Sequence, residues 1–359
     1  MAQEPLLATP KPAPDLKIPS SNSTVKVSCI DSTSRIGVEI SAFLEPNIKG
    51  HQWLHCPAFS YLIQHPSGKN LLFDLGVRKD WENLPPALVK RIHDKGWYAN
   101  VEKNVAEILD DNGVKRDNID SIIWSHYHWD HTGDPSTFPS STSLVVGPGF
   151  KSKYVPGYPK NQDAPVLDSD WQGRELREIE FADGGPKIGR FKAHDWFADG
   201  SFYLLDTPGH TIGHMCGLAR TRSNPDAFVF MGGDACHHGG EFRPTQYLPL
   251  PQSISPSPFA SETEEARREP AMRTARSICP GSLFQDVHPA KSATEPFYQP
   301  TAEVSWDVEL ARWVVGGMEE FDAQENVLIG IAHDTEFIGN VPMFPEDLSN
   351  WQKTGCKEK

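Results

Sequence analysis

Short apolar runs, separated by turn-forming residues, divide most of the chain after residue 22 into segments of strand length. Runs of this kind, and runs in which apolar and polar residues alternate, predict β-strands. We expect strands at residues 25–30, 37–43, 60–64, 70–74, 120–125, 143–146, 202–206, 215–220, 227–231 and 326–332.

Three segments carry the helical period instead. Residues 86–95 and 101–111 are expected to form helices, and apolar residues on one face of the second precede the stop signal Asn112-Gly113. Residues 305–322 place apolar side chains near one face, which predicts an amphipathic helix. Strands and helices therefore both contribute, and the chain contains no internal repeat.

Two segments break this rhythm. Residues 1–22 are rich in Pro, Ser and Lys, which predicts a flexible N-terminal arm. Residues 239–303 are rich in Pro and Ser, with a charged stretch at 261–268 that favours a helix. A long irregular segment is uncommon in a compact domain and often functional. We therefore expect one domain at 23–359, with a cap or lid inserted at about 239–303.

The composition narrows the classes of partner. The 359 residues carry a net charge of −14 without a basic stripe, so we expect no nucleic-acid partner. No apolar run reaches the roughly 18 residues of a membrane span. The N-terminal stretch lacks the basic and apolar regions of a signal peptide. Six scattered cysteines without a C-x-x-C pair are typical of free thiols, and we expect a cytoplasmic protein.

The stretch SHYHWDHTGD at residues 125–134 follows a predicted strand and concentrates metal-ligating side chains. Positions i and i+2 of an extended segment point the same way, so His126 and His128 can hold one ion. Asp130 and His131 then turn towards a second ion. Imidazole and carboxylate ligands suit zinc and related divalent metals. A histidine-rich surface turn is the alternative, and ligands elsewhere in the chain decide between the two.

Three further candidate ligands follow predicted strands. His210 in TPGHTIGH, Asp234 in FMGGDACHH and His333 in IAHDTEF each come soon after such a strand. Loops at strand ends commonly carry functional residues, and the small residues beside these three permit close backbone approach. The pattern therefore favours a two-metal site over a surface turn.

Together these motifs resemble the metallo-β-lactamase superfamily. The resemblance rests on H-x-H-x-D-H, T-P-G-H, G-D and a late histidine, with F-D-L-G upstream, and covers roughly residues 35–235 and 326–336. It implies an α+β fold, the four-layer αββα sandwich in which two packed sheets are flanked by helices. It also implies two divalent metal ions, with zinc as the favoured identity.

The resemblance gives each candidate ligand a role. One ion would be held by His126, His128 and His210, and the other by Asp130, His131 and His333. Asp234 would bridge both ions, and Asp74 would support a ligand without binding metal itself.

Within the superfamily, IAHDTE resembles the N-acyl homoserine lactonase branch. Members of that branch carry a tyrosine three residues after the bridging aspartate, where this chain has His237. His237 is therefore the candidate donor to the developing oxyanion. Asp130 is the candidate for orienting the nucleophile and moving its proton, and Asp234 is the third catalytic candidate.

The expected function is hydrolysis of a small molecule. Two divalent ions lower the pKa of a shared water, and the bridging hydroxide would open a cyclic ester, a lactone. The alternatives are a heterocyclic lactam or carbamate, in detoxification, and a thioester of the polyketide-release or glyoxalase II type. Redox members of the fold carry H-x-E-x-D-H, and His128 in that second position favours hydrolysis. A non-catalytic binding module is disfavoured, because no ligand position has been lost.

Overall fold

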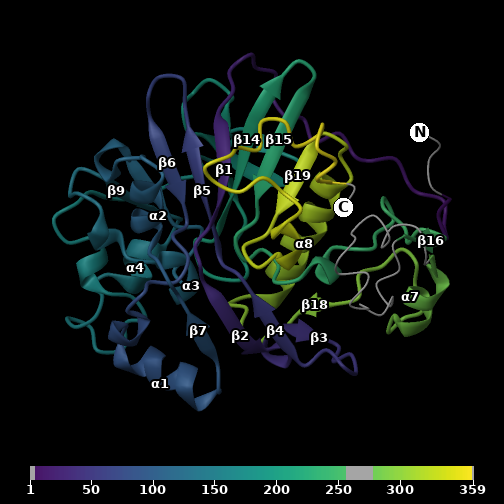
Figure 1. The fold of residues 1–359 in the computed structure, drawn as a ribbon, viewed down its shortest axis with the longest axis horizontal. Coiled ribbons are helices and arrows are strands. Elements are labelled where there is room, and N and C mark those ends of the chain that lie inside the picture. The colour runs from purple at the N-terminus through teal and green to yellow at the C-terminus, as the bar shows by residue number, and fades with distance from the viewer. Residues whose placement is uncertain (1–4, 256–277, 358–359) are drawn as a thin grey trace.

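Two six-stranded sheets form the centre of the protein in a computed structural model that describes residues 5–255 and 278–357 (Figure 1). The first sheet contains, in order, β1 (Lys26–Asp31), β5 (Phe59–Gln64), β6 (Asn70–Phe73), β8 (Ser121–Ile123), β9 (Ser143–Val146) and β10 (Leu176–Glu178). The second contains β11 (Lys187–Ile188), β12 (Phe191–Asp195), β13 (Phe202–Asp206), β14 (Met215–Ser223), β15 (Asp226–Met231) and β19 (Val327–Gly330).

The direction of the strands explains their sequence pattern. In the first sheet β6, β8, β9 and β10 are parallel, and the three residues of β8 are all buried. A parallel strand that is covered on both faces reads as a continuous apolar run. In the second sheet only β15 and β19 form a parallel pair, and the other strands are joined antiparallel.

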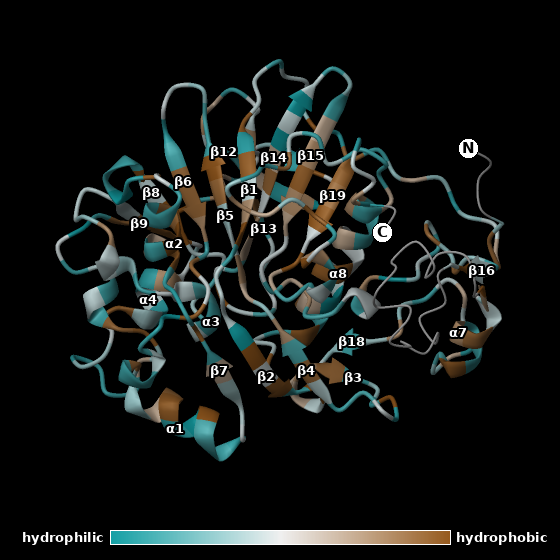
Figure 2. Cartoon of the chain, in the orientation of Figure 1, coloured by the Kyte–Doolittle hydropathy of each residue, from teal (hydrophilic) through white to brown (hydrophobic). Residues whose placement is uncertain are grey.

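Apolar side chains pack in three layers. Between the sheets, Phe59 and Phe73 meet Phe202 and Met231 in one buried cluster. The outer face of the second sheet is covered by α8 (Val308–Asp322), whose Phe321 packs against the strands. The outer face of the first sheet is covered by α2 (Val105–Asp111) and α4 (Phe150–Tyr154). Hydrophobic residues accordingly concentrate on the central strands (Figure 2). This confirms the α+β fold and the αββα sandwich.

A smaller group of elements lies at one end of the sandwich (Figure 1). A three-stranded sheet contains β4 (Trp53–Cys56), β2 (Arg35–Glu39) and β7 (Tyr98–Asn100), and α1 (Pro86–Asp94) lies beside it. Two short pairs complete the structure: β3 (Leu44–Glu45) with β18 (Gln299–Pro300), and β16 (Ser253–Ile254) with β17 (Cys279–Pro280), which precedes α7 (Ser282–Val287).

Most predicted elements are present within a few residues of their expected bounds. The expected helix at 101–111 begins only at Val105, because Asn104 starts it and donates its backbone N–H to the Glu107 carboxylate. The expected strand at 37–43 is β2 followed by a turn of 3-10 helix, Ile40–Ala42. Strands β11 and β12 were not expected, because they are defined by pairing, of β11 with β12 and of β12 with β13, rather than by a long apolar run. The helix expected at 261–268 lies outside the described residues.

The N-terminal segment, expected to be a loose arm, runs along the body of the protein from residue 5. Leu7 donates its N–H to the Leu250 carbonyl at 2.8 Å, and Leu16 is buried beside the second sheet. Gly189 donates its N–H to the Leu16 carbonyl at 2.6 Å. Backbone hydrogen bonds and the buried side chain of Leu16 thus define the path of this segment, whose composition predicted no fixed path. Residues 5–7 lie against the described start of the expected insertion, through a bridge between Leu6 and Pro251.

Two expectations drawn from composition can be compared with the described chain. All six cysteines are buried free thiols. No helix in the described residues combines the length and the apolar composition needed to cross a membrane.

Candidate metal centre

The first motif lies where the first sheet ends and a short helix begins. Strand β8 stops at Ile123, and the chain then carries His126 and His128 in a loop before α3 (Trp129–Thr132). The helix presents Asp130 and His131 in its only turn, and the His131 N–H donates to the His128 carbonyl at 3.0 Å. The predicted division of the motif, two histidines before a turn and two ligands in it, therefore matches the structure.

The other three candidate ligands lie together because of strand direction. Strands β13 and β15 are both antiparallel to β14, and β19 is parallel to β15. The carboxyl ends of β13, β15 and β19 therefore share one edge of the second sheet. His210, Asp234 and His333 follow these three ends in the chain. The sandwich brings this edge next to the loop after β8.

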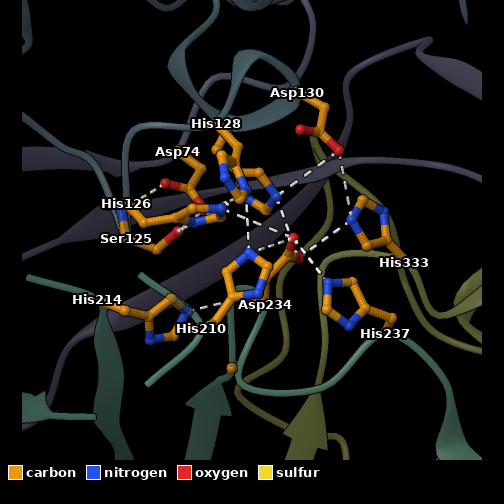
Figure 3. Close-up of polar contacts among 12 residues, drawn as sticks. Asp74, Ser125, His126, His128, Asp130, His210, His214, Asp234, His237 and His333 are labelled. Carbon is orange, nitrogen blue, oxygen red and sulfur yellow. Dashed lines mark hydrogen bonds and ion pairs between the residues drawn. The ribbon is translucent and has the colours of Figure 1, made fainter. Parts of the chain in front are cut away.

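The candidate ligands form two groups that meet at Asp234 (Figure 3). One group is His126, His128, His210 and Asp234, and the other is Asp130, His131, Asp234 and His333. In each group the ligand atoms lie within 4.8 Å of one another. These are the same two sets that the resemblance implies.

The two carboxylate oxygens of Asp234 face different groups of candidate ligands. Its Oδ2 lies 3.7 Å from His126 Nε2 and 3.5 Å from His210 Nε2. Its Oδ1 lies 3.1 Å from His131 Nε2 and 3.0 Å from His333 Nε2. Each oxygen of one buried carboxylate therefore faces a different set of imidazoles.

Hydrogen bonding within the protein leaves this cluster incomplete. Among the described residues, His126 Nε2, His131 Nε2 and Asp234 Oδ1 are buried without a hydrogen-bond partner. Buried polar groups are normally paired, so these atoms fit a cation that their lone pairs would bind. Imidazole nitrogen and carboxylate oxygen suit divalent transition metals and zinc.

Burial and neighbouring charge act differently on the two groups. Burial, together with the neighbouring imidazoles, keeps the pKa of His126 and His210 well below the ordinary value. Burial also opposes the charged form of His131, but the carboxylates around it outweigh burial and raise its pKa to about 10. The three imidazoles of the first group are thus neutral, the form that binds metal, whereas the second group holds Asp130 as well as the shared Asp234.

Several contacts orient the candidate ligands from behind. Asp74 Oδ2 accepts hydrogen bonds from His131 Nδ1 at 2.9 Å and from Ser125 Oγ at 2.7 Å. His333 Nδ1 donates to the Pro57 carbonyl at 2.7 Å. Such contacts fix which ring nitrogen faces the metal. Asp74 therefore lies where the resemblance implies a supporting residue.

His214, which follows the candidate ligand His210 in the same loop, also acts from behind the site. Its Nε2 accepts the backbone N–H of Asp234 at 3.1 Å, and its Nδ1 donates to the Thr207 carbonyl at 3.0 Å. Burial lowers the pKa of His214 to about 3, so the ring is neutral and can accept at one nitrogen while donating at the other.

His237 faces the same centre but belongs to neither group. Its Nε2 lies 3.4 Å from Asp234 Oδ2, and neither ring nitrogen has a hydrogen-bond partner among the described residues. The buried Glu241 holds the backbone here, because its Oε2 accepts the N–H groups of His237 and His238 at 2.5 Å and 3.1 Å. Sequence reasoning did not identify Glu241, although it lies four residues after His237 in the chain.

Five of the seven candidate ligands line the inner end of a cavity of about 350 Å³: His128, Asp130, His210, Asp234 and His333. Its walls are mostly apolar and aromatic, and come mainly from the first half of the chain: Ile36, Val38, Phe43, Leu54, Trp97, Tyr127, Trp129, Tyr154 and Trp306. Trp129, inside the first motif, thus has a place in the cavity wall. The apolar and aromatic wall residues carry no sequence signal that marks them as lining a cavity. From the described part of the expected insertion at 239–303, Glu303 alone lines the cavity.

Comparisons with known proteins agree with this architecture. The family profile described as the metallo-beta-lactamase superfamily matches residues 54–229. Gamma-lactamase FDB1 of Fusarium pseudograminearum is 44% identical over 354 residues, which cover 96% of this chain and 83% of that protein. Gamma-lactamase MBL2 of Gibberella moniliformis is 50% identical over 242 residues, 67% of this chain and 96% of that protein.

Among solved structures, AiiA of B. thuringiensis, crystallised with N-decanoyl-L-homoserine, superimposes with a TM-score of 0.58 at 18% identity. The match covers 90% of this chain and 99% of AiiA, and it establishes a likeness of fold. From the profile match, the full-length relatives and the shared fold, the chain belongs to the metallo-β-lactamase superfamily and is a metal-dependent hydrolase.

Proposed function

We propose that the protein is a two-metal hydrolase, with zinc as the favoured metal, that opens the ring of a small lactam. The observation that carries the proposal is Asp234, whose two carboxylate oxygens face two separate groups of ligands at the inner end of an apolar cavity. Two divalent ions bound there would lower the pKa of a shared water enough to supply hydroxide at neutral pH.

The side chains around the ions would handle the proton and the developing charge. Asp130 lines the cavity, and its Oδ2 lies 3.5 Å from His333 Nε2, so it can orient a water and take its proton. A ring-opening amide nitrogen must be protonated as it leaves, and Asp130 can return the proton to it. His237, whose ring nitrogens have no hydrogen-bond partner within the described part of the chain, can donate a hydrogen bond to the carbonyl oxygen as it gains negative charge.

The choice of a cyclic amide rests on the relatives. Two relatives, 44% and 50% identical, are named gamma-lactamases, which favours a lactam over the lactone expected from the sequence. A lactone is the second candidate, because His333 is followed by Asp334, as in the lactonase branch. A thioester is the third class to be tested, since the same nucleophile would attack it.

The experiment is a hydrolysis screen of metal-replete protein with γ-lactams, γ-lactones and acyl thioesters. We expect ring opening of lactams at the highest kcat/KM. Metal analysis of the same sample should give close to two ions per chain, and active protein with one ion or none would refute the two-metal reading. A clear preference for lactones or thioesters would refute the lactam assignment.

Asp234→Asn tests the bridging role directly. The variant should lose at least about a thousandfold in kcat/KM while its circular dichroism is unchanged, because one oxygen of the shared carboxylate becomes a neutral amide nitrogen. Asp183→Asn is the matched control, since this aspartate side chain is 99% exposed and lies outside the cavity. Full activity of Asp234→Asn would contradict the assignment.

A further inference from the structure

The cavity wall carries two cations in a protein that is acidic as a whole. The net charge of the chain is −14, yet Arg91, in the last turn of α1, and Lys153, in the last turn of α4, both line the cavity that holds the candidate ligands. Within residues 5–255 and 278–357, neither side chain forms an ion pair with a carboxylate. These two positive charges are therefore available to a bound molecule.

The acidic residue of the outer wall does not neutralise them. Glu303 lines the same cavity, but its Oε1 is paired with Lys95 Nζ at 2.7 Å. The carboxylates of Asp130 and Asp234 lie at the inner end, among the candidate metal ligands. The outer wall therefore has an excess of positive charge, and the inner end would carry its own cations when loaded.

A pair of tyrosines links the two cations to the candidate ligands. The Tyr127 ring lies 4.7 Å from the His128 ring and 4.2 Å from the Tyr154 ring, centroid to centroid. Lys153 directly precedes Tyr154 in the chain, and both tyrosines line the same cavity as Arg91 and Lys153. The two cations and the tyrosine pair thus line one cavity. Of the two tyrosines, Tyr127 is the one that contacts the candidate ligand His128.

The position of Arg91 is restrained by a second contact. Its guanidinium carbon lies 5.9 Å from the centre of the Trp97 ring, within the range of a cation–π contact. Trp97 also lines the cavity. A guanidinium that rests on a cavity wall keeps its N–H donors for a ligand, and carboxylates accept such donors in pairs.

We propose that Arg91 and Lys153 select substrates that carry a carboxylate outside the ring that is opened. This rests on the proposed function, because it places the scissile carbonyl at the inner end and the carboxylate at the outer wall. The apolar residues between them would cover the neutral part of the molecule. A positive wall within a negative surface also concentrates such anions at the cavity, and salt screens this effect.

A purely structural role for these cations predicts something different. Cations are favoured at helix C-terminal ends by the helix dipole, and Arg91 lies in such a turn. In that case the loss of Arg91 would lower the free energy of unfolding and affect all substrates equally. Discrimination between charged and neutral substrates therefore separates the two roles.

The test compares matched pairs of compounds that differ in one charge. Phthalide-5-carboxylate and phthalide-5-carboxamide are cyclic esters, and oxindole-5-carboxylate and oxindole-5-carboxamide are cyclic amides. We expect kcat/KM for the carboxylate to exceed that for the carboxamide by roughly 3- to 10-fold, mainly through KM, as two partly exposed ion pairs would give. Added salt should reduce the difference.

The variants decide whether the two residues cause the preference. Arg91→Gln with Lys153→Gln should abolish it. Lys90→Gln with Lys151→Gln is the matched control, since it removes the same charge from the same two helices outside the cavity and should retain the preference. A preference that survives in the first double variant, or no preference in the unaltered protein, would overturn the proposal.

Calorimetric binding of the same four compounds to metal-stripped protein provides a readout that does not depend on hydrolysis. Without metal a carboxylate cannot bind as a ligand, so tighter binding of the carboxylates than of the carboxamides, lost in Arg91→Gln with Lys153→Gln, supports the proposal. Equal binding overturns it. If no compound is hydrolysed by loaded protein, the proposed function fails, and the binding comparison still decides the role of the two cations.

Discussion

If the proposed two-metal site is correct, Asp74→Asn should weaken the binding of one metal ion far more than the binding of the other. Asp74 Oδ1 accepts the Ser125 N–H at 2.6 Å, and Oδ2 accepts Ser125 Oγ and His131 Nδ1 at 2.7 and 2.9 Å. An asparagine offers one oxygen and one NH₂ group, so at least one of these donors would face another donor. His131 belongs to the group with Asp130, Asp234 and His333, whereas the other group has no direct bond to Asp74.

The magnitude follows from the loss of a charged acceptor behind a metal ligand. Such losses typically weaken metal affinity about 10- to 100-fold, which corresponds to about 1.4 to 2.7 kcal/mol. Asparagine is the right substitution because Asp74 has a φ of 59°, in the left-handed region that asparagine tolerates better than alanine. The backbone can therefore remain in place while the charge is removed.

The assay is competition with a chelator, followed as two successive dissociation constants. In Asp74→Asn we expect the dissociation constant of the more weakly bound ion to rise about 10- to 100-fold, and that of the other ion to change by less than about twofold. The circular dichroism spectrum should remain unchanged. Asp183→Asn, on the exposed surface, should leave both constants as they are. If the binding of both ions weakens equally, or the binding of neither ion weakens, the reasoning that the Asp74 carboxylate acts through His131 is refuted.

Three further substitutions, and one control, test separate parts of the structure. A Cβ on Gly147 would lie 1.8 Å from a backbone carbonyl oxygen, so Gly147→Ala should lower the free energy of unfolding by about 2–4 kcal/mol, measured with denaturant. Gly239→Ala, which meets nothing within 4 Å, should change it by less than about 0.5 kcal/mol. Burial opposes the charged form of Asp199, but hydrogen bonds from a serine and a histidine outweigh it and lower the pKa to about 2. Because the pKa of Asp199 is lower in the folded protein, Asp199→Asn should lower the free energy of unfolding by on the order of 1–2 kcal/mol above pH ~4. The difference in free energy between the variant and the unaltered protein should disappear as the pH falls towards 2. Glu241→Ala should reduce kcat with metal content unchanged, because the backbone N–H of His237 loses its acceptor; an unchanged kcat would show that Glu241 does not position this ring.

The local pattern of the chain predicted most of the strands and singled out the candidate ligand residues. Strands such as β9 and β13 were predicted at their observed bounds, because a strand buried between layers must be apolar over its whole length. The first motif was recognisable because imidazole and carboxylate side chains are costly to bury without a partner. Its spacing placed His126 and His128 apart from Asp130 and His131, as in the structure.

Other features depend on contacts between segments that are far apart in the chain. Periodicity reports that a residue is buried but not what covers it, so the pairing of β12 with β13 had no signal. The same holds for the N-terminal segment, where Leu16 is a single apolar anchor among polar neighbours. The expected lid at 239–303 contributes only Glu303 to the cavity among its described residues, because the wall comes mainly from the first half of the chain.

The sequence by itself determined where most strands would form and which seven side chains could bind metal, since both follow from the local spacing of apolar and ligating residues. The packing of the strands into two sheets was implied by the resemblance to the superfamily. Only the tertiary structure decided that the ends of β13, β15 and β19 share one edge, so that the two oxygens of Asp234 face two different groups. It alone decided that Arg91 and Lys153, on separate helices, line one cavity. The physical reason is that strand direction and sheet packing determine which distant residues meet, and neither is encoded in the spacing of residues along a single segment.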